Sequence, residues 1–125
     1  HAALYLSEDV VVPLSAIARL VDALPGYETR HGVDIFAFGH AGDGNIHLNI
    51  ISQNPDHQDR MDQAAEGLLR LGLDLGGTIS GEHGIGLAKR QYLPLELSPV
   101  SIALQRGIKQ LFDPNQILNP GKIFP

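Results

Sequence analysis

The chain has 125 residues, 43% of them hydrophobic and 18% charged, a balance typical of a folded globular domain rather than of a disordered segment. Its formal net charge of −5 argues against nucleic-acid binding, because no basic surface is available to neutralise phosphates. Without Cys it forms neither disulfides nor thiolate metal sites, and no apolar run approaches the roughly 18–20 residues that span a bilayer. We expect a single domain over residues 1–125, cut from a longer protein, that resides in the cytoplasm or reaches a membrane surface only through partners.

The first two predicted elements are a strand and a helix. Apolar and β-branched residues predict the strand over 2–12, with an interruption at Ser7–Glu8. The helix is expected to run from an N-cap at Ser15 to about Leu24, because Pro25–Gly26 is a stop signal. Its predicted apolar face carries Ile17, Leu20, Val21 and Leu24.

Two further strands and a second helix follow. The strands are predicted over Val33–His40 and Asn45–Ile51, on either side of a Gly-rich connection. The helix is predicted to open at Asn54–Asp56 and to end near Leu75, and Gly67 and Gly72 weaken this pattern without breaking it. Its expected buried stripe comprises Met61, Ala64, Ala65, Leu68, Leu69 and Leu73.

The C-terminal third carries weaker signals and one clear helix. Thr78–Ser80 is a candidate short strand, and Leu87–Tyr92 a short helix that ends before Pro94. Ser98–Pro99 has the cap-then-proline form of a helix start, and the tail from Asp113 is expected to be ordered but irregular. The elements together predict an α+β fold: an antiparallel sheet with helices packed on one face, as in a ferredoxin-like cap-type domain.

The connection between the second and third strands predicts a metal site. Asp43–Gly44 between two apolar runs is typical of a type I′ hairpin turn. With that turn His40 lies directly opposite His47, with Cβ atoms roughly 4.5–5.5 Å apart, and two imidazoles at that distance can chelate one ion. Asn45 and Asn49 share the face of His47. A longer loop would change the register without necessarily separating the rings, and the alternative is that each His is structural.

A second Gly-rich loop, Gly81–Gly86, supplies a carboxylate and another imidazole. Two His and one carboxylate with an open fourth position make a catalytic site for zinc or another divalent ion, and Glu82 is the obvious third ligand. Adjacent side chains in an extended segment point opposite ways, so Glu82 can face a metal while His83 faces substrate. The alternative interpretation is an exposed polar turn.

Three segments resemble the C-terminal domain of FAD-linked oxidases. They are residues 40–49 (HAGDGNIHLN), residues 81–86 (GEHGIG) and residues 112–124 (FDPNQILNPGKIF), and the stretch Asp9–Pro13 matches the way this domain commonly opens. The family includes the glycolate oxidase FAD subunit, D-lactate dehydrogenase and D-2-hydroxyglutarate dehydrogenase, within the vanillyl-alcohol-oxidase group. Where some relatives carry an Arg after the Val-Pro, this sequence has Leu14.

The resemblance implies a role for each motif residue. His40, His47 and Glu82 match the ligands of a divalent metal, with zinc favoured and iron or manganese as alternatives. His83 matches the base that removes the α-hydroxyl proton of a 2-hydroxy acid before hydride passes to the flavin. Asn49 matches a substrate contact, and Asn45 is the other amide able to orient a ligand or the substrate.

The resemblance also implies partners outside this chain. Asn119 and Lys122 match positions near the flavin, as does His83, whereas FAD itself is expected to be bound mainly by a separate FAD-binding domain of the same protein. The isolated domain is therefore expected to be inactive, and an electron-transfer protein is a further possible partner. Two other functions stay open from the residues alone: a stand-alone metal-dependent hydrolase and a non-catalytic anion-binding module.

Overall fold

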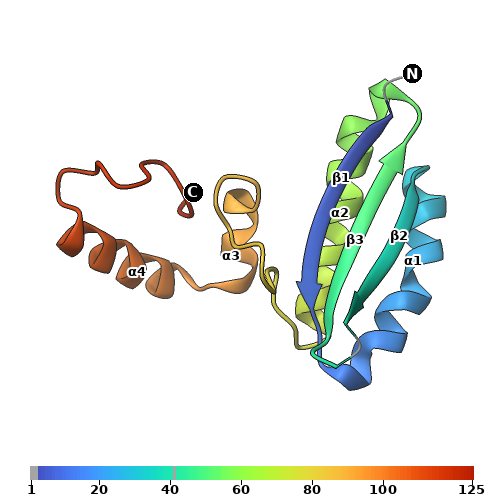
Figure 1. Cartoon of the computed structure of the whole chain (residues 1–125), viewed down its shortest axis with the longest axis horizontal. Helices are drawn as coiled ribbons and strands as arrows, with labels where there is room; N and C mark the ends of the chain where they lie inside the picture. The colour runs from blue at the N-terminus through green and yellow to red at the C-terminus, as the bar shows by residue number, and fades with distance from the viewer. Residues whose placement is uncertain (1–2, 41) are drawn as a thin grey trace. The chain divides into compact units, whose positions relative to one another are not determined.

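The computed structural model describes residues 3–40 and 42–125, and for His40 it describes the backbone but not the side chain. The chain divides into two compact units, one ending at Glu82 and the other beginning at His83 (Figure 1). Each unit is described by itself below. The expectation of one domain over residues 1–125 stays a prediction.

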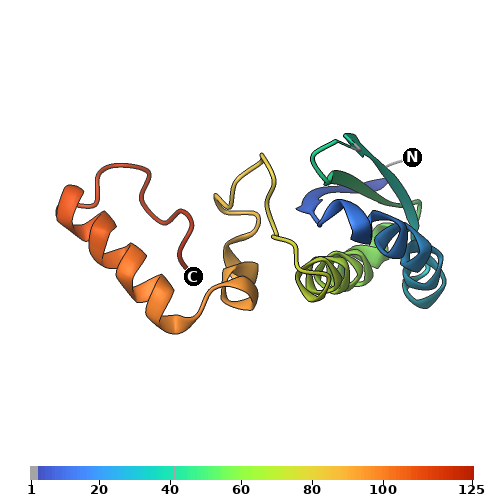
Figure 2. The ribbon, with the colours of Figure 1, turned by 90° about the horizontal axis from the view of Figure 1, so that it is seen from below.

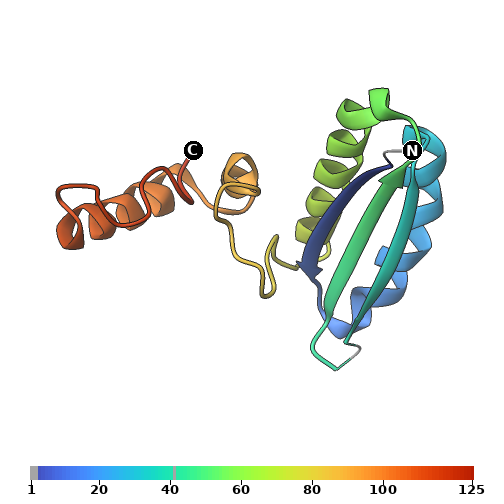
Figure 3. The same ribbon diagram turned by 45° about the horizontal axis from the view of Figure 1, so that its top comes forward.

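The first unit is a three-stranded antiparallel sheet covered on one face by two helices. Its strands are β1 (Leu4–Val11), β2 (Asp34–His40) and β3 (Asn45–Ser52), and β3 lies in the centre with β1 and β2 antiparallel to it. The helices α1 (Ile17–His31) and α2 (Gln58–Asp74) both lie on the same side of the sheet (Figures 2 and 3). This arrangement confirms the α+β prediction, and its β-α-β-β-α order matches the first five elements of the β-α-β-β-α-β split βαβ fold. Short 3-10 turns, η1 (Leu14–Ala16) and η2 (Pro55–His57), precede the two helices.

The core lies between the helices and one face of the sheet. Strand alternation gives this face its buried side chains, among them Val10, Leu48 and Ile50. We call the opposite side, which carries Tyr5, Phe36, Phe38, His47 and Asn49, the open face of the sheet, because no described helix covers it and its three aromatic side chains are exposed. The helices contribute Leu20, Leu24, Met61, Ala64, Ala65, Leu68 and Leu69 to the core.

The first strand is unbroken, so the predicted interruption at Ser7–Glu8 is wrong. All residues of β1 pair with β3, with Ser7 opposite Asn49 and Glu8 opposite Leu48. Pairing along the whole strand overrides the low strand propensity of the polar residues, because propensity is a weak guide inside a sheet. The predicted start at Ala2 lies outside the described residues.

The first helix passes through Pro25, so the predicted end near Leu24 is wrong. An internal proline costs about 3 kcal/mol or more, and tertiary contacts of the next turn offset this cost. The hydroxyl of Tyr27 donates to the carbonyl of Gly67 in α2 at 3.2 Å. Oε1 of Glu28 accepts from the backbone N–H of Ile35 in β2 at 2.8 Å. The helix ends instead at Gly32, whose φ of 65° is the left-handed C-cap conformation.

The hairpin between β2 and β3 exists, but its register differs by two residues from the prediction. His40 lies opposite Asn45, and Phe38 lies opposite His47. A type I′ turn needs positive φ at both Asp43 and Gly44, yet only Gly44 has it, at 75°. The Asp43 carboxylate instead accepts from the backbone N–H of Asn45 at 2.9 Å, which closes a longer connection.

The second helix agrees with its prediction, and its glycines have a packing reason. All residues of the predicted stripe are buried except Leu73, which is half-buried. The neighbouring Gly72 is buried as well. A Cβ on Gly67 would lie 2.6 Å from the ring of Tyr27, and one on Gly72 would lie 2.4 Å from Cγ2 of Val10. Each glycine therefore lets another element approach α2 closely.

The second unit contains η3 (Arg90–Tyr92), α3 (Leu93–Glu96) and α4 (Pro99–Phe112), followed by an irregular tail. Ser98 caps α4 as predicted, since its hydroxyl accepts from the backbone N–H of Ser101 at 3.1 Å. The short helix predicted over Leu87–Tyr92 is reduced to η3, and Pro94 lies in the first turn of α3 rather than after a helix. No described helix combines the length and the apolar character needed to cross a membrane.

Candidate functional site

The first unit brings two of the predicted metal ligands together. Nε2 of His47 lies 3.1 Å from Oε1 of Glu82, although the residues are 35 positions apart in the sequence. The His47 side chain is 12% exposed and that of Glu82 is 56% exposed, so the pair has a buried side and an accessible one. An imidazole nitrogen and a carboxylate oxygen at this separation are the donor types that zinc, iron and manganese take in proteins.

The ring of His47 is held by its neighbour on β2. Phe38 lies directly opposite it, and the two rings stack with centroids 5.2 Å apart and an interplanar angle of 28°. Stacking against an aromatic face restricts the rotation of the imidazole. The nitrogen that meets Glu82 is therefore presented in a defined direction.

The segment that carries Glu82 is fastened to the end of β1. Val11 and Thr78 exchange two backbone hydrogen bonds, of 3.2 and 2.9 Å. A Cβ on Gly77 would lie 1.9 Å from the Val11 carbonyl oxygen, so only glycine allows this approach. The contact is an isolated bridge rather than the short strand predicted over Thr78–Ser80.

Asp9 is a buried residue beside the candidate site that sequence reasoning misses. Its side chain is fully buried, and Oδ2 accepts from the backbone N–H groups of both Gly81 and Glu82 at 2.8 Å. The only signal in the sequence is a carboxylate directly before three valines.

The two asparagines of β3 lie beside His47 on the same face of the sheet. Oδ1 of Asn49 accepts from the hydroxyl of Tyr5 at 2.8 Å, which leaves the amide NH₂ group as the donor on its other side. Asn45 is buried, and among the side chains that are described its Oδ1 has no hydrogen-bond partner. Both amides are thus placed to meet a polar ligand beside the His47–Glu82 pair.

Of the remaining predicted residues, His40 belongs to the first unit, and His83, Asn119 and Lys122 belong to the second. The backbone of His40 lies at the end of β2, opposite Asn45, and its side chain lies outside the description. His83 is exposed and follows Glu82 directly. Asn119 and Lys122 belong to the tail of the second unit, where Asn119 adopts a φ of 47°.

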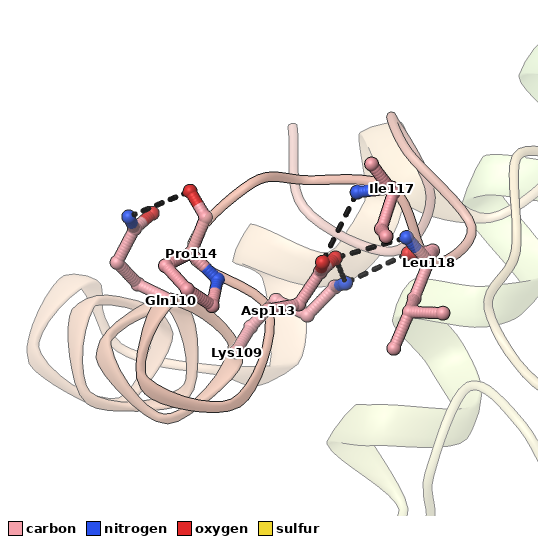
Figure 4. Close-up of polar contacts among 6 residues, drawn as sticks. All are labelled: Lys109, Gln110, Asp113, Pro114, Ile117 and Leu118. Carbon is pink, nitrogen blue, oxygen red and sulfur yellow. Dashed lines mark hydrogen bonds and ion pairs between the residues drawn. The ribbon is translucent and has the colours of Figure 1, made fainter.

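The tail of the second unit is organised by Asp113 (Figure 4). Its carboxylate accepts from the backbone N–H groups of Ile117 and Leu118 at 3.0 and 3.1 Å, and it pairs with the ammonium group of Lys109. The same ammonium group donates to the Leu118 carbonyl at 2.7 Å. One nearly buried carboxylate therefore fixes the turn that leads to Asn119.

The charge on Asp113 makes this turn sensitive to acid. The hydrogen bond from Lys109, supported by the two backbone N–H groups, holds the pKa of the Asp113 carboxyl below its ordinary value of 3.8. A lowered pKa contributes stability that is fully present above the ordinary value and is lost as the pH falls through the lowered one. The turn should therefore persist at neutral and mildly acidic pH.

We expect Asp113→Asn to loosen the tail at neutral pH, because the amide lacks the charge that the ammonium group and the two N–H groups require. At neutral pH, hydrogen exchange at the Ile117 and Leu118 amides should be faster in the variant than in the wild type. Gln110→Ala is the matched control, since the contact described for its side chain is a long one of 3.5 Å to the Pro114 carbonyl. Unchanged exchange in Asp113→Asn would contradict this role.

Comparison with known proteins gives one family and a consistent group of relatives. A family model described as "FAD linked oxidases, C-terminal domain" matches residues 1–123. The glycolate oxidase subunit GlcD of Bacillus subtilis is 42% identical over 119 residues, covering 94% of this chain and 25% of the relative. D-lactate dehydrogenase of Anaerostipes hadrus is 42% identical over 118 residues, covering 92% and 25%.

A third relative carries a different substrate in its name. D-2-hydroxyglutarate dehydrogenase of Xanthomonas citri pv. viticola is 41% identical over 128 residues, covering 93% of this chain and 26% of the relative. The chain thus spans about a quarter of the length of these curated relatives.

Proposed function

Because this chain belongs to the family of FAD-linked oxidases, as their C-terminal domain, we propose that it forms the substrate- and metal-binding part of an enzyme that oxidises a 2-hydroxy acid to a 2-oxo acid. The names of the relatives support this substrate class, since glycolate, D-lactate and D-2-hydroxyglutarate all carry a hydroxyl group beside a carboxylate. Both compact units take part in this function as a single domain.

The observation that carries the proposal is the contact between His47 and Glu82. A largely buried imidazole and an accessible carboxylate 3.1 Å apart, next to the buried amide of Asn45, suit a divalent cation that keeps positions open for substrate. His47, Glu82 and His40 would hold this ion, with zinc favoured over iron or manganese. The ion would supply Lewis-acid chemistry and FAD would accept a hydride, as the family match implies.

The protein's own residues bind the acid and move its proton. Asn49 donates its amide NH₂ group to an oxygen of the substrate, with the Tyr5 hydroxyl fixing the orientation of the amide. His83 accepts the proton of the α-hydroxyl group while the α-hydrogen leaves as hydride, so that the C–O bond becomes a carbonyl. One 2-hydroxy acid thus yields one 2-oxo acid, a proton on His83 and a reduced flavin.

The tail supplies contacts on the flavin side. Asn119 and Lys122 lie in the turn that Asp113 organises, and this order suits residues that must be held near a flat cofactor. The FAD-binding part of the protein and an electron acceptor complete the enzyme. A stand-alone hydrolase has no use for such a tail, and the family match favours the dehydrogenase.

The test uses the full-length protein that contains this chain, purified with its FAD. Mixed anaerobically with glycolate, D-lactate or D-2-hydroxyglutarate, its flavin absorption should bleach with at least one acid, and elemental analysis should find about one divalent ion per chain. The proposed function would be contradicted if dithionite reduces the flavin and none of the three acids does.

A further inference from the structure

The first unit contains a buried carboxylate, Asp9, to which the proposed function gives no role. Asp9 is fully buried on β1, directly opposite His47 on β3, in a run of residues that is otherwise β-branched. Burying a carboxylate is costly unless hydrogen bonds compensate, so its partners indicate why it is there. Two of those partners come from the loop that carries Glu82.

Two partners of Asp9 are backbone N–H groups of consecutive residues. Oδ2 accepts from Gly81 and from Glu82 at 2.8 Å each, across separations of 72 and 73 residues. A single oxygen with two charge-assisted bonds fixes both the position and the direction of the loop backbone. A Cβ on Gly81 would lie 2.6 Å from Cγ2 of Val11 and 2.7 Å from Oδ1 of Asn45, so the loop lies flush against the sheet at this point.

The position of this clamp determines where the Glu82 side chain emerges. Directly opposed residues in an antiparallel pair have Cα atoms roughly 4.5–5.5 Å apart, so an amide held by Asp9 lies close to His47. From that amide the Glu82 carboxylate reaches Nε2 of His47 at 3.1 Å. Glycines at positions 81, 84 and 86 give this loop wide backbone freedom, which the two bonds to Asp9 restrict.

We propose that Asp9 is a positioning residue that holds the Glu82 backbone so that the Glu82 carboxylate meets His47 in metal-binding geometry. Asp9 touches neither the substrate nor the ion in this role. The inference rests on the proposed function in so far as the ion is concerned, whereas the clamp itself stands on the contacts of Asp9.

The first measurement is the affinity of the full-length enzyme for Zn²⁺, determined by competition with a chelator. Asp9→Ala should weaken binding by about 10- to 100-fold, the usual effect of removing a group that orients a ligand. Asp9→Asn keeps an oxygen acceptor without the charge and should give an intermediate loss. Asp34→Asn, the same chemical change at an exposed position of β2, should bind as the wild type does.

The second measurement is independent of the metal. Hydrogen exchange at the amides of Gly81 and Glu82 should be slow in the metal-free wild type and faster in Asp9→Asn and Asp9→Ala, with Asp34→Asn unchanged. If Asp9→Ala does not fold, Asp9→Asn decides both measurements. Wild-type exchange and wild-type affinity in the folded variants would overturn the proposal, whereas a wild type that binds no Zn²⁺ but shows the exchange effect would count against the proposed metal and not against the clamp.

Discussion

Replacing His83 by Ala in the full-length enzyme is expected to lower kcat for the 2-hydroxy acid by on the order of 10²- to 10⁴-fold, the usual contribution of a general base. Bound metal should be retained, because His47 and Glu82 meet each other without His83. The measurement is steady-state turnover beside elemental analysis of the same samples. A folded, metal-loaded and inactive variant is the expected result.

The outcome that would contradict this division of roles is loss of the metal together with turnover. His31→Ala is the matched control, since it removes an imidazole at the end of α1, where the ring stacks on Tyr27 with centroids 6.1 Å apart. That control should retain both turnover and metal.

A His47→Ala variant is expected to lose both the metal and turnover. His47 is the most enclosed of the described ligands, and its removal leaves the Glu82 carboxylate without its partner. A metal site that has lost its His47 ligand cannot hold the ion in a fixed geometry, so both the metal content and kcat should fall to background. Metal content is measured after mild dialysis, before and after reloading with zinc or manganese.

The control for His47 is His57→Gln, at the start of α2. The ring of His57 contacts the Ser52 hydroxyl at 2.9 Å and belongs to the local cap of η2, so its loss should leave the metal content unchanged. A His47→Ala variant that binds one ion per chain and still turns over would show that the ion lies elsewhere.

The sequence predicts which helices and strands form better than it predicts where they end and how they are connected. The stripe from Met61 to Leu69 is periodic enough to define α2, and Ser98–Pro99 marks the start of α4 correctly. Pro25 misleads because a local stop signal is outweighed by contacts of Tyr27 and Glu28, which lie far away in the sequence. Helix propensity describes an isolated segment and does not include the tertiary contacts that the segment makes in the folded protein.

In the candidate site, too, local patterns are predictable from the sequence and long-range contacts are not. The hairpin register shifts by two residues, which keeps every side chain on its predicted face because the strand repeat is two. The polar face with His47 and Asn49 is therefore predictable, although the opposite partner of His47 is not. Asp9 could not be identified, because a single carboxylate beside three valines does not reveal a partner 72 residues away.

The long sequence separation between β1 and the Glu82 loop also has a kinetic consequence. The contact of Asp9 with Gly81 closes a loop of 72 residues, which is among the slowest kinds of contact to form during folding. If Asp9 has the proposed positioning role, the candidate site would not assemble in an intermediate that lacks β1, even with the hairpin of β2 and β3 already paired. During refolding, metal binding should consequently recover only after the last cooperative folding step. The ion would then report that folding is complete and would not guide its early stages.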